Sequence, residues 1–309
     1  MFAKLKEVHE QCRVLRLQKR HSSFSLEQIE DSLDQQYLSV CGRKIDWQNP
    51  KSFTEKTNVY KVHHYNELKS RCADKYEVRA WVEEKIGKDH LIPVYGLYED
   101  FEDIRFDDLP DRFVMKCTHD CNSTTIVEDK NSLCLSALKK RYDYFKKVNL
   151  AYLNFELHYK NIKPRILIEE SIGSNIDDYK FLCFGGSPYY CWVDKDRLSD
   201  HKRMVFDMEW NEAPFQIGTY KKIRERIERP ENFDEMVEIA KKLSAGFSQV
   251  RVDLYSEKGV VYFGEMTFTT ANGMIRFFPE EYDFQLGDLW NLETERKNSD
   301  EIKAYLSDE

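Results

Sequence analysis

Residues 251–268 constrain the fold of this chain more than any other stretch of its sequence. Two alternating apolar runs flank residues 256–259 (Ser-Glu-Lys-Gly), a pattern that predicts a β-hairpin with Gly259 in the left-handed position of a three-residue turn. Such a turn pairs Ser256 with Val260. The register of the other residues in the two strands follows from that pair.

Under this register, Asp253 faces Phe263 and Arg251 faces Glu265 across the hairpin. Because side chains alternate between the faces of a strand, Arg251, Asp253 and Glu265 share one face, and the two carboxylates are diagonal neighbours. Two carboxylates this close repel each other unless a cation lies between them, and Mg²⁺ prefers carboxylate oxygens. The same spacing fits a solvent-facing hairpin with ordinary surface acids. The strongly apolar residues at the alternate positions favour a half-buried pair of acids instead.

Composition limits the class of protein. The chain has 309 residues, of which 41% are hydrophobic and 14% aromatic, so it can form a large packed core in about two domains. Its net charge of −8 argues against nucleic acid as the main partner. The first residues lack the apolar core of a signal peptide, and no apolar run of ~18 residues occurs. We therefore expect a cytoplasmic protein that does not insert into a membrane, whereas the oligomeric state stays open.

Eight cysteines are scattered along the chain without a CxxC pair, which predicts reduced thiols rather than a disulfide framework. Cys117 and Cys121 lie close to His119, but the number and spacing of these ligands fit a metal site poorly. We expect these three residues to be structural.

Predicted helices alternate with strands, several of which are joined as hairpins. A capping box at Ser52 and Glu55 predicts a helix over residues 52–68. Further helices are predicted at residues 74–86, 132–147, 234–247 and 299–307, and strands at residues 111–116, 125–128, 166–170, 179–184 and 189–193. This pattern predicts an α+β fold in two lobes. We expect a mainly helical N-terminal segment at residues 1–70, a small lobe at 71–172 and a large lobe at 173–309.

Lysines near the ends of predicted elements indicate phosphate contacts. Lys116 ends an apolar strand and enters the polar loop 119–125, where a lysine can neutralise phosphate oxygens while loop amides and hydroxyls donate to them. The loop contains no glycine, so its backbone approaches a phosphate less closely. Lys75 follows Asp74 at the start of a predicted helix. A surface hairpin with a strand-end lysine, and a helix cap with a surface lysine, are the alternative interpretations.

Charged residues on three further segments indicate nucleotide contacts. Glu169 and Glu170 end an apolar strand whose edge can hydrogen-bond a flat base, although solvated acids at a strand end also fit. Lys180 lies inside an otherwise apolar strand, where an unpaired charge is costly, so a bound anion or a carboxylate must pair with it. Arg197 belongs to a charged turn that also fits a solvated loop.

Five stretches together resemble the ATP-grasp superfamily, and in particular its TupA-like branch of teichuronopeptide biosynthesis. The matching stretches are residues 109–116, 164–170, 178–185, 193–197 and 251–273. Each stretch is weak alone, but the five follow the order of the family and together span most of the chain.

The resemblance implies an ATP-grasp fold in which two α+β lobes clamp ATP. It implies that Lys75 and Lys116 contact phosphates, that Glu169, Glu170 and Ile172 form the adenine hinge, and that Asp178 binds the ribose. It also implies that Asp253, Glu265 and Thr267 hold Mg²⁺, that Arg251 lies near the transferred phosphate, and that Lys180 and Arg197 belong to the catalytic set.

Three features depart from the family pattern. Thr267 stands where the superfamily often has an asparagine, and its hydroxyl is a weaker and smaller ligand than an amide oxygen. The loop after Lys116 lacks the glycines that are common there. Residues 1–70 are too helical and too short for the N-terminal substrate domain of many members.

The resemblance further implies a ligase that uses ATP and Mg²⁺ to activate a carboxylate as an acyl phosphate and joins it to an amine. The implied setting is the decoration of capsular polysaccharide or teichuronopeptide, with uronic or amino acids and amines as substrates. A kinase of a sugar or alcohol, and an inactive nucleotide-binding module, are alternatives; Thr267 and the glycine-poor loop support the second. Residues between 185 and 230 either line an acceptor pocket or belong to the core, namely Tyr189, Tyr190, Trp192, Arg203 and Trp210.

Overall fold

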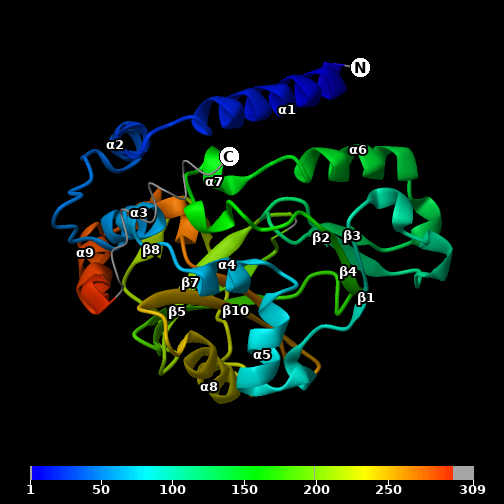
Figure 1. The fold of residues 1–309 in the computed structure, drawn as a ribbon. Helices are drawn as coiled ribbons and strands as arrows, with labels where there is room; N and C mark the ends of the chain where they lie inside the picture. Colours follow the sequence, from blue (N-terminus) through cyan, green and yellow to red (C-terminus); the bar gives the residue numbers. More distant parts are fainter. Residues whose placement is uncertain (1, 198, 295–309) are drawn as a thin grey trace. The chain divides into compact units, whose positions relative to one another are not determined.

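The computed structural model describes residues 2–197 and 199–294 (Figure 1). The acidic helix predicted at residues 299–307 lies outside this part of the chain. The chain forms two compact units by its internal contacts. The first consists of Met1–Ile29, Asn66–Glu77 and Ile92–Ile172, and the second of Glu30–Tyr65, Val78–Leu91 and Gly173–Glu309.

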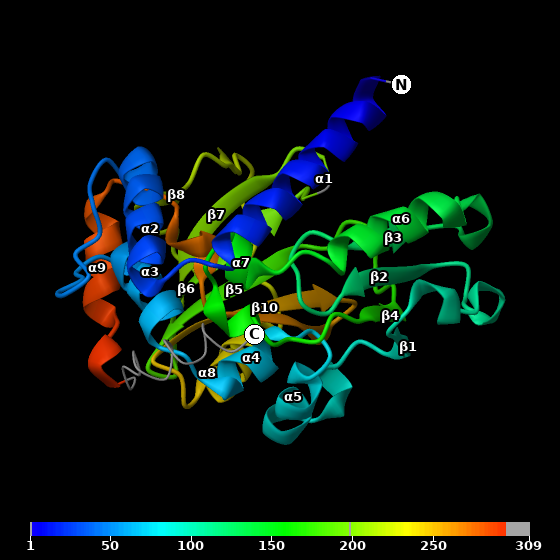
Figure 2. The same ribbon diagram turned by 45° about the horizontal axis from the view of Figure 1, so that its top comes forward.

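The first unit is built on a four-stranded antiparallel sheet with the order β1-β4-β2-β3. Its strands are β1 (Val94–Tyr98), β2 (Phe113–Cys117), β3 (Thr125–Val127) and β4 (Ile166–Glu170). Helix α6 (Leu135–Phe145) covers this sheet in both ribbon views (Figures 1 and 2), and its Leu138 and Tyr142 join Phe113 and Met115 in one buried cluster.

The other helices of the first unit are short or lie near the N-terminus. They are α1 (Phe2–His21), α4 (Glu67–Ala73) and α7 (Leu150–Leu153), with 3-10 helices at Phe101–Asp103, Phe106–Asp108, Lys130–Ser132 and Leu157–Tyr159. Helix α2 (Leu26–Cys41) begins in the first unit and continues in the second. None of the helices in the described part of the chain combines the length and apolarity that a membrane span requires.

The second unit is built on a six-stranded sheet with the order β11-β10-β5-β6-β7-β9. Its strands are β5 (Asp178–Phe184), β6 (Ser187–Lys195), β7 (Lys202–Asp207), β9 (Lys221–Lys222), β10 (Gln249–Glu257) and β11 (Val260–Thr267). All neighbours are antiparallel except β7 and β9. A two-stranded sheet pairs β8 (Gln216–Ile217) with β12 (Phe277–Phe278).

The second unit also contains four further α-helices. They are α3 (Phe53–His63), α5 (Val78–Ile86), α8 (Phe233–Ser244) and α9 (Glu281–Leu289), with 3-10 helices at Lys88–His90, Thr270–Gly273 and Leu292–Thr294. Helix α8 covers one face of the six-stranded sheet, where Phe233 stacks on Phe181 of β5 with ring centroids 5.7 Å apart (Figure 1). Because side chains alternate along a strand, Asp178 and Lys180 of β5 lie on the opposite face.

The predicted hairpin forms β10 and β11, but its turn differs from the prediction. Glu257 pairs with Val260, so the turn has two residues, Lys258 and Gly259. Both have positive φ angles, 52° and 80°, as the favoured two-residue hairpin turns require. The predicted three-residue turn is therefore wrong, because Lys258 adopts a left-handed conformation that its side chain gives no reason to expect.

A β-bulge at Gly264 then shifts the register of the hairpin. Asp253 pairs directly with Glu265, and Arg251 pairs with Thr267 instead of the predicted Glu265. A Cβ atom at position 264 would lie only 3.0 Å from the backbone oxygen of Asp253, which explains why a glycine occupies the bulge. The predicted sharing of one face by Arg251, Asp253 and Glu265 is confirmed, and the acids are direct rather than diagonal neighbours.

The capping box is confirmed, but the helix that it opens is shorter than predicted. Ser52 and Glu55 satisfy each other's backbone N–H groups at the start of α3. The helix ends at His63, and α4 begins anew at Glu67 with Asn66 as its cap. The helix predicted over residues 74–86 begins only at Val78.

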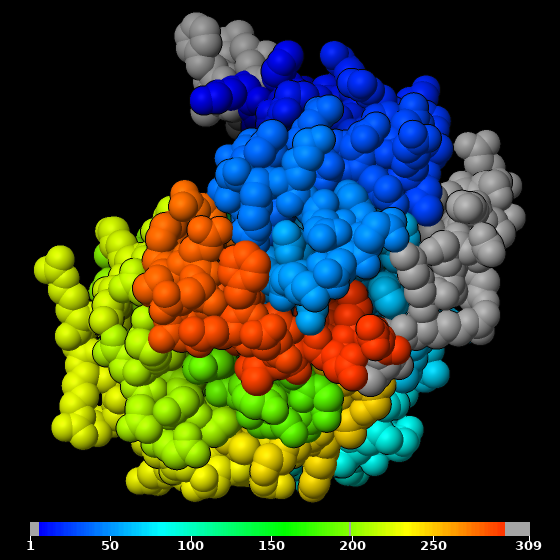
Figure 3. Space-filling view, turned by 90° about the vertical axis from the view of Figure 1, so that its left-hand side faces the viewer, coloured from blue at the N-terminus to red at the C-terminus, as the bar shows by residue number. Residues whose placement is uncertain are grey.

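Helix α3 connects residues 30–65 with the C-terminal part of the second unit. The backbone N–H and hydroxyl of Thr54 donate to the buried Asp283 of α9 at 2.9 and 2.6 Å. Arg43 donates to the same carboxylate at 2.9 Å. Figure 3 shows these two parts of the chain, far apart in sequence, side by side: light blue near residue 50 and orange to red after residue 275.

Candidate active site

Neighbouring strands bring polar residues together on the sheet face opposite α8. Asp253 of β10 pairs with Glu265 of β11 on one side and with Lys180 of β5 on the other. Two residues away on β10, Arg251 pairs with Thr267. The structure thus brings together five residues that the sequence assigned to metal binding or catalysis.

Arg251 lies between the two acids of the hairpin. Its Nε and Nη2 donate to the two oxygens of Asp253 at 2.6 and 2.7 Å. Nη2 also donates to Glu265 Oε1 at 2.9 Å and to Thr267 Oγ1 at 3.0 Å. The guanidinium therefore supplies a positive charge where two carboxylates would otherwise repel each other.

Lys180 extends this arrangement to a third acid. Its Nζ donates to Asp253 Oδ2 at 2.5 Å and to Asp178 Oδ2 at 2.6 Å, which confirms the prediction that the lysine must be paired. Arg197 Nη1 also donates to Asp178 Oδ2. Three cations and three acids alternate in this group, which we call the Arg251 cluster. It consists of Arg251, Asp253, Glu265, Thr267, Lys180, Asp178 and Arg197.

Burial and charge act in opposite directions on the ionisation of the cluster. Burial raises the pKa of Asp253, although the positive charges of Arg251 and Lys180 oppose this effect. Burial alone would lower the pKa of Arg251, but the charge of Asp253 outweighs it and the pKa is raised. The pKa of Arg197 is raised in the same way by Asp178. Both guanidinium groups therefore stay charged, and Asp253 depends on its cationic neighbours to stay ionised.

The oxygen atoms of the Arg251 cluster are of the type that binds a magnesium ion. Mg²⁺ usually takes one or two carboxylates and completes its shell with water and phosphate oxygens. Glu265 is the accessible acid, with a side chain 36% exposed. Asp253 is buried and both its oxygens accept hydrogen bonds, so it reaches a metal through a remaining lone pair or after Arg251 moves. Among the described residues, no three His, Cys, Asp or Glu side chains are arranged to hold a metal by themselves.

In the first unit, the structure brings both predicted phosphate lysines to the loop that follows β2. Lys116 forms an ion pair with Glu169, and both side chains are largely buried. The backbone N–H of Lys75 donates to Thr118 O at 2.9 Å, and its Nζ donates to the backbone oxygen of Asp120. Because an ammonium has three N–H donors, either lysine can also donate to an anion bound at this loop while it keeps this partner.

Side chains shape this loop in place of glycines. The backbone N–H of Cys117 donates to Ser123 Oγ at 2.6 Å, and the hydroxyl donates to Asp120 Oδ1 at 2.5 Å. His119 is buried and bonds the backbone oxygen of Val148 at 3.0 Å, which agrees with its predicted structural role. Cys121 is exposed, whereas Cys117 is buried.

The predicted adenine hinge lies at the end of β4. Glu169 is buried and pairs with Lys116. Glu170 is half-buried, and its backbone N–H donates to Pro93 O at 2.9 Å. Ile172 is half-buried and is the last residue of the first unit. The predicted ribose ligand Asp178 belongs to the second unit, where its Oδ1 is buried without a hydrogen-bond partner among the described residues.

Sequence reasoning gave no role to Asp194, which anchors a second charged group on the same sheet face. Arg203 donates from Nε and Nη2 to the two oxygens of Asp194 at 2.6 and 2.7 Å. The guanidinium carbon lies 5.1 Å from the ring centroid of Trp192 and 4.0 Å from that of Tyr220. We call Asp194, Arg203, Trp192 and Tyr220 the Arg203 cluster. An acid directly after the apolar strand predicted at residues 189–193 was the available signal.

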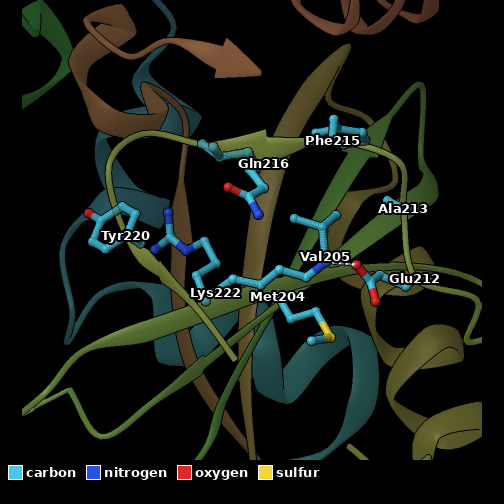
Figure 4. A pocket seen from close by; sticks show the side chains of 10 residues that line it. Met204, Val205, Glu212, Ala213, Phe215, Gln216, Tyr220 and Lys222 are labelled. Carbon is cyan, nitrogen blue, oxygen red and sulfur yellow. Dashed lines mark ion pairs between the residues drawn. The ribbon is translucent and has the colours of Figure 1, made fainter. Parts of the chain in front are cut away.

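Two of the residues expected either in an acceptor pocket or in the core differ in burial. Trp192 is 1% exposed and belongs to the core, whereas Tyr189 is 40% exposed. A small pocket beside β7 is bounded by Val205, Phe215, Gln216 and Tyr220, with the ion pair of Lys222 and Glu212 among its lining residues (Figure 4). Its free volume of about 20 Å³ has room for water but not for a sugar.

The model of the TupA-like ATP-grasp family matches residues 55–291 of the sequence. This chain belongs to that family. The match includes both units and every predicted site residue, from Lys75 to Thr267. The predicted α+β ATP-grasp fold and the predicted family are thereby confirmed. No curated protein matches the chain in sequence.

Solved structures that resemble the chain do so at low identity. They include D-alanine–D-alanine ligase from Bacillus anthracis, with 17% identity over 79% of this chain and 72% of that chain, at a TM-score of 0.44. An L-amino acid ligase from Bacillus licheniformis has 13% identity over 89% of this chain, at a TM-score of 0.49. This chain spans 63% of that ligase's length.

Proposed function

We propose that this protein is an ATP- and Mg²⁺-dependent ligase that activates a carboxylate as an acyl phosphate and passes the acyl group to an amine. The observation that carries the proposal is the convergence of Asp253, Glu265 and Thr267 with two cations, Arg251 and Lys180, on one face of a sheet in an ATP-grasp protein. Phosphoryl transfer to a carboxylate brings two anions together, so it needs cations at the point of reaction.

Each member of the Arg251 cluster has a role in this proposal. Glu265 and Thr267 hold Mg²⁺ together with Asp253, and the ion supplies charge neutralisation for the phosphate oxygens. Arg251 stabilises charge on the transferred phosphoryl group because its fork of donors matches phosphate oxygens. Lys180 pairs with the buried Asp253 and Asp178, Arg197 pairs with Asp178, and both cations complete the positive field.

Residues of the first unit and Asp178 bind the nucleotide in this proposal. Lys75 and Lys116 bind phosphate oxygens, and their present partners show that each ammonium can be held by an oxygen acceptor. Glu169, Glu170 and Ile172 bind the adenine at the end of β4. The buried Asp178 Oδ1 offers an acceptor to a ribose hydroxyl.

The proposed substrates are a small uronic or amino acid and an amine. We place the reaction in the cytoplasm, in the decoration of capsular polysaccharide or teichuronopeptide. The TupA-like family model supports this setting. The net charge of −8 supports a small-molecule partner over a nucleic acid.

A nucleotide-binding module without catalysis is the second candidate. It is supported by Thr267, a weak metal ligand, and by the hydrogen bonds that already occupy both oxygens of Asp253. This candidate predicts that ATP stabilises the protein against heat while no ADP or coupled product forms.

The test is product formation from ATP, Mg²⁺ and a panel of uronic and amino acids, with and without amines, measured by mass spectrometry and ADP release. The double substitution Asp253→Asn and Glu265→Gln should abolish both signals. Glu257→Gln is the matched control because Glu257 lies on the same hairpin outside the Arg251 cluster. Turnover that survives the double substitution contradicts the metal assignment, and a phosphorylated product that accumulates without amine indicates a kinase.

A further inference from the structure

The residues that follow β11 adopt an unusual backbone conformation. Ala271 has φ 48° and ψ 30°, Asn272 has φ 58° and ψ 18°, and Gly273 has φ 68°. We call Thr270–Gly273 the left-handed turn. Residues with a Cβ atom avoid this region, and two in succession persist only where the surroundings enforce the conformation. The turn therefore requires an external support.

Helix α3 supplies that support through two buried side chains. Lys61 is 2% exposed, and its Nζ donates to both the backbone oxygen and the side-chain oxygen of Asn272 at 2.8 Å. Asn58 is fully buried, and its Nδ2 donates to Gly273 O at 3.0 Å. A Cβ atom at position 273 would lie 2.6 Å from that nitrogen, so the fit depends on glycine. These bonds join residues more than 200 positions apart in the sequence.

The left-handed turn also controls the end of the strand that carries the metal ligands. Among the described residues, β11 is an edge strand that pairs only with β10, and the bulge at Gly264 already interrupts it. Only Phe268 and Thr269, both buried, separate Thr267 from the turn. Because no described strand pairs with the outer edge of β11, the direction of its last residues depends on β10 and on the segment that follows.

We propose that Lys61 and Asn58 are positioning residues for the magnesium ligands Glu265 and Thr267. They hold the left-handed turn and thereby fix the end of β11, although neither touches the metal or the nucleotide. This inference rests on the proposed function. It also gives a role to residues 30–65. Asp283 of α9 holds α3 in place through Thr54, and α3 in turn holds the left-handed turn.

The test compares two lysines of the same helix. Lys61→Met removes the support of the turn, whereas Lys56→Met is a matched control. Lys56 Nζ likewise donates to two backbone oxygens, of Gly287 and Trp290, at 2.7 Å, but these belong to α9 and the residue after it. Calorimetry measures the Kd of a non-hydrolysable ATP analogue with Mg²⁺ and with EDTA. We expect Lys61→Met to raise the Kd with Mg²⁺ about tenfold and leave the Kd with EDTA within twofold.

A suppressor separates positioning from general destabilisation. Glycine adopts positive φ without strain, so Asn272→Gly in the Lys61→Met background should recover most of the magnesium-dependent affinity. Lys61→Arg, which keeps a cationic donor, should lose less than threefold. If Lys61→Met does not fold, Lys61→Gln replaces it, with an expected loss of at least threefold.

The inference is overturned if Lys61→Met and Lys56→Met lower the melting temperature and change both Kd values alike. It is also overturned if the glycine suppressor restores nothing. Failure of the metal assignment looks different, because the wild-type protein would then bind the analogue no more tightly with Mg²⁺ than with EDTA. Failure of the ligase proposal shows itself as the absence of a coupled product and leaves this comparison of Kd values unaffected.

Discussion

Two arginine–carboxylate groups lie on the same face of the six-stranded sheet, and they differ in how completely their charges are paired within the group. In the Arg203 cluster, one guanidinium meets one carboxylate through two hydrogen bonds and is stacked by two aromatic rings. In the Arg251 cluster, one guanidinium is shared by two carboxylates and a hydroxyl, and a lysine and a second arginine join the group.

This difference indicates a structural role for the Arg203 cluster and a chemical role for the Arg251 cluster. Arg203 and Asp194 pair with each other, with side chains 8% and 1% exposed, and His201 Nε2 lies 3.3 Å from Asp194 Oδ1, so a ligand has little to gain there. The Arg251 cluster has one accessible acid, Glu265, and a buried carboxylate whose ionisation depends on its neighbours. A site that binds and releases cations and phosphates needs charged groups that remain available to these ligands. We therefore expect substitutions in the Arg203 cluster to cost stability and substitutions in the Arg251 cluster to cost activity.

The largest expected effect is on turnover. Asp253→Asn with Glu265→Gln should lower kcat/KM about a thousandfold, or about 4 kcal/mol, because two metal ligands are lost. Glu265→Gln alone should lose activity with less than about 1 kcal/mol of stability, since that side chain is partly exposed. Steady-state kinetics and urea unfolding check the two statements. A double variant that retains a tenth of the wild-type activity would remove the contrast between the clusters.

The next effect is on stability. Asp194→Asn leaves Arg203 buried without its carboxylate and should lower the free energy of unfolding by about 3–5 kcal/mol. Turnover per folded molecule should stay within about twofold of the wild type. Urea unfolding followed by circular dichroism measures the loss. Asp196→Asn is the control, since Asp196 lies in the next turn with its side chain 35% exposed. A loss of activity that exceeds the loss of folded protein would move Asp194 into the active site.

Acid unfolding sharpens the same contrast. Burial alone would raise the pKa of Asp194, but the hydrogen bonds and charge of Arg203 outweigh it and lower the pKa to about 2. A depressed folded-state pKa gives stability that is present above the ordinary value of 3.8 and is lost as pH falls through about 2. The ion pair should therefore contribute about 2 kcal/mol at pH 5 that disappears near pH 2. The difference in unfolding free energy between wild type and Asp194→Asn should shrink accordingly from pH 5 to pH 2, whereas a constant difference would contradict the assignment.

The smallest expected effect is on the magnesium dependence of activity and concerns the Arg251 cluster alone. Thr267→Asn restores the amide oxygen common in the superfamily and should lower the Mg²⁺ concentration for half-maximal activity about threefold. Thr267→Val removes the hydroxyl at similar volume and should raise it. Equal magnesium dependence in all three proteins would show that position 267 does not contact the ion.

Sequence reasoning found the face of the hairpin but not its geometry. Alternation identified the strands and placed Arg251, Asp253 and Glu265 together, because a period of two is readable from apolar spacing. The turn was not predicted because a left-handed lysine at 258 has no distinct local signal. The bulge was missed although a lone glycine inside a strand, here Gly264, often marks one. Each deviation shifts the register, and together they bring Asp253 directly opposite Glu265.

A site residue could be predicted where its own strand shows that it needs a partner. Lys180 needed a partner because it interrupts an apolar strand, and the structure supplies two acids. Lys61 and Asn58 were missed because their partners lie more than 200 residues away, and their helical neighbours read as an ordinary capped helix. Contacts of that range depend on tertiary packing and leave no trace in local periodicity.

Calorimetric titration of the wild-type protein with a non-hydrolysable ATP analogue tests the central claim most directly. If Asp253 and Glu265 converge on one divalent ion, Mg²⁺ should tighten nucleotide binding at least about tenfold, and the double substitution Asp253→Asn with Glu265→Gln should remove that gain. Binding of equal strength with Mg²⁺ and with EDTA in the wild-type protein would contradict the account.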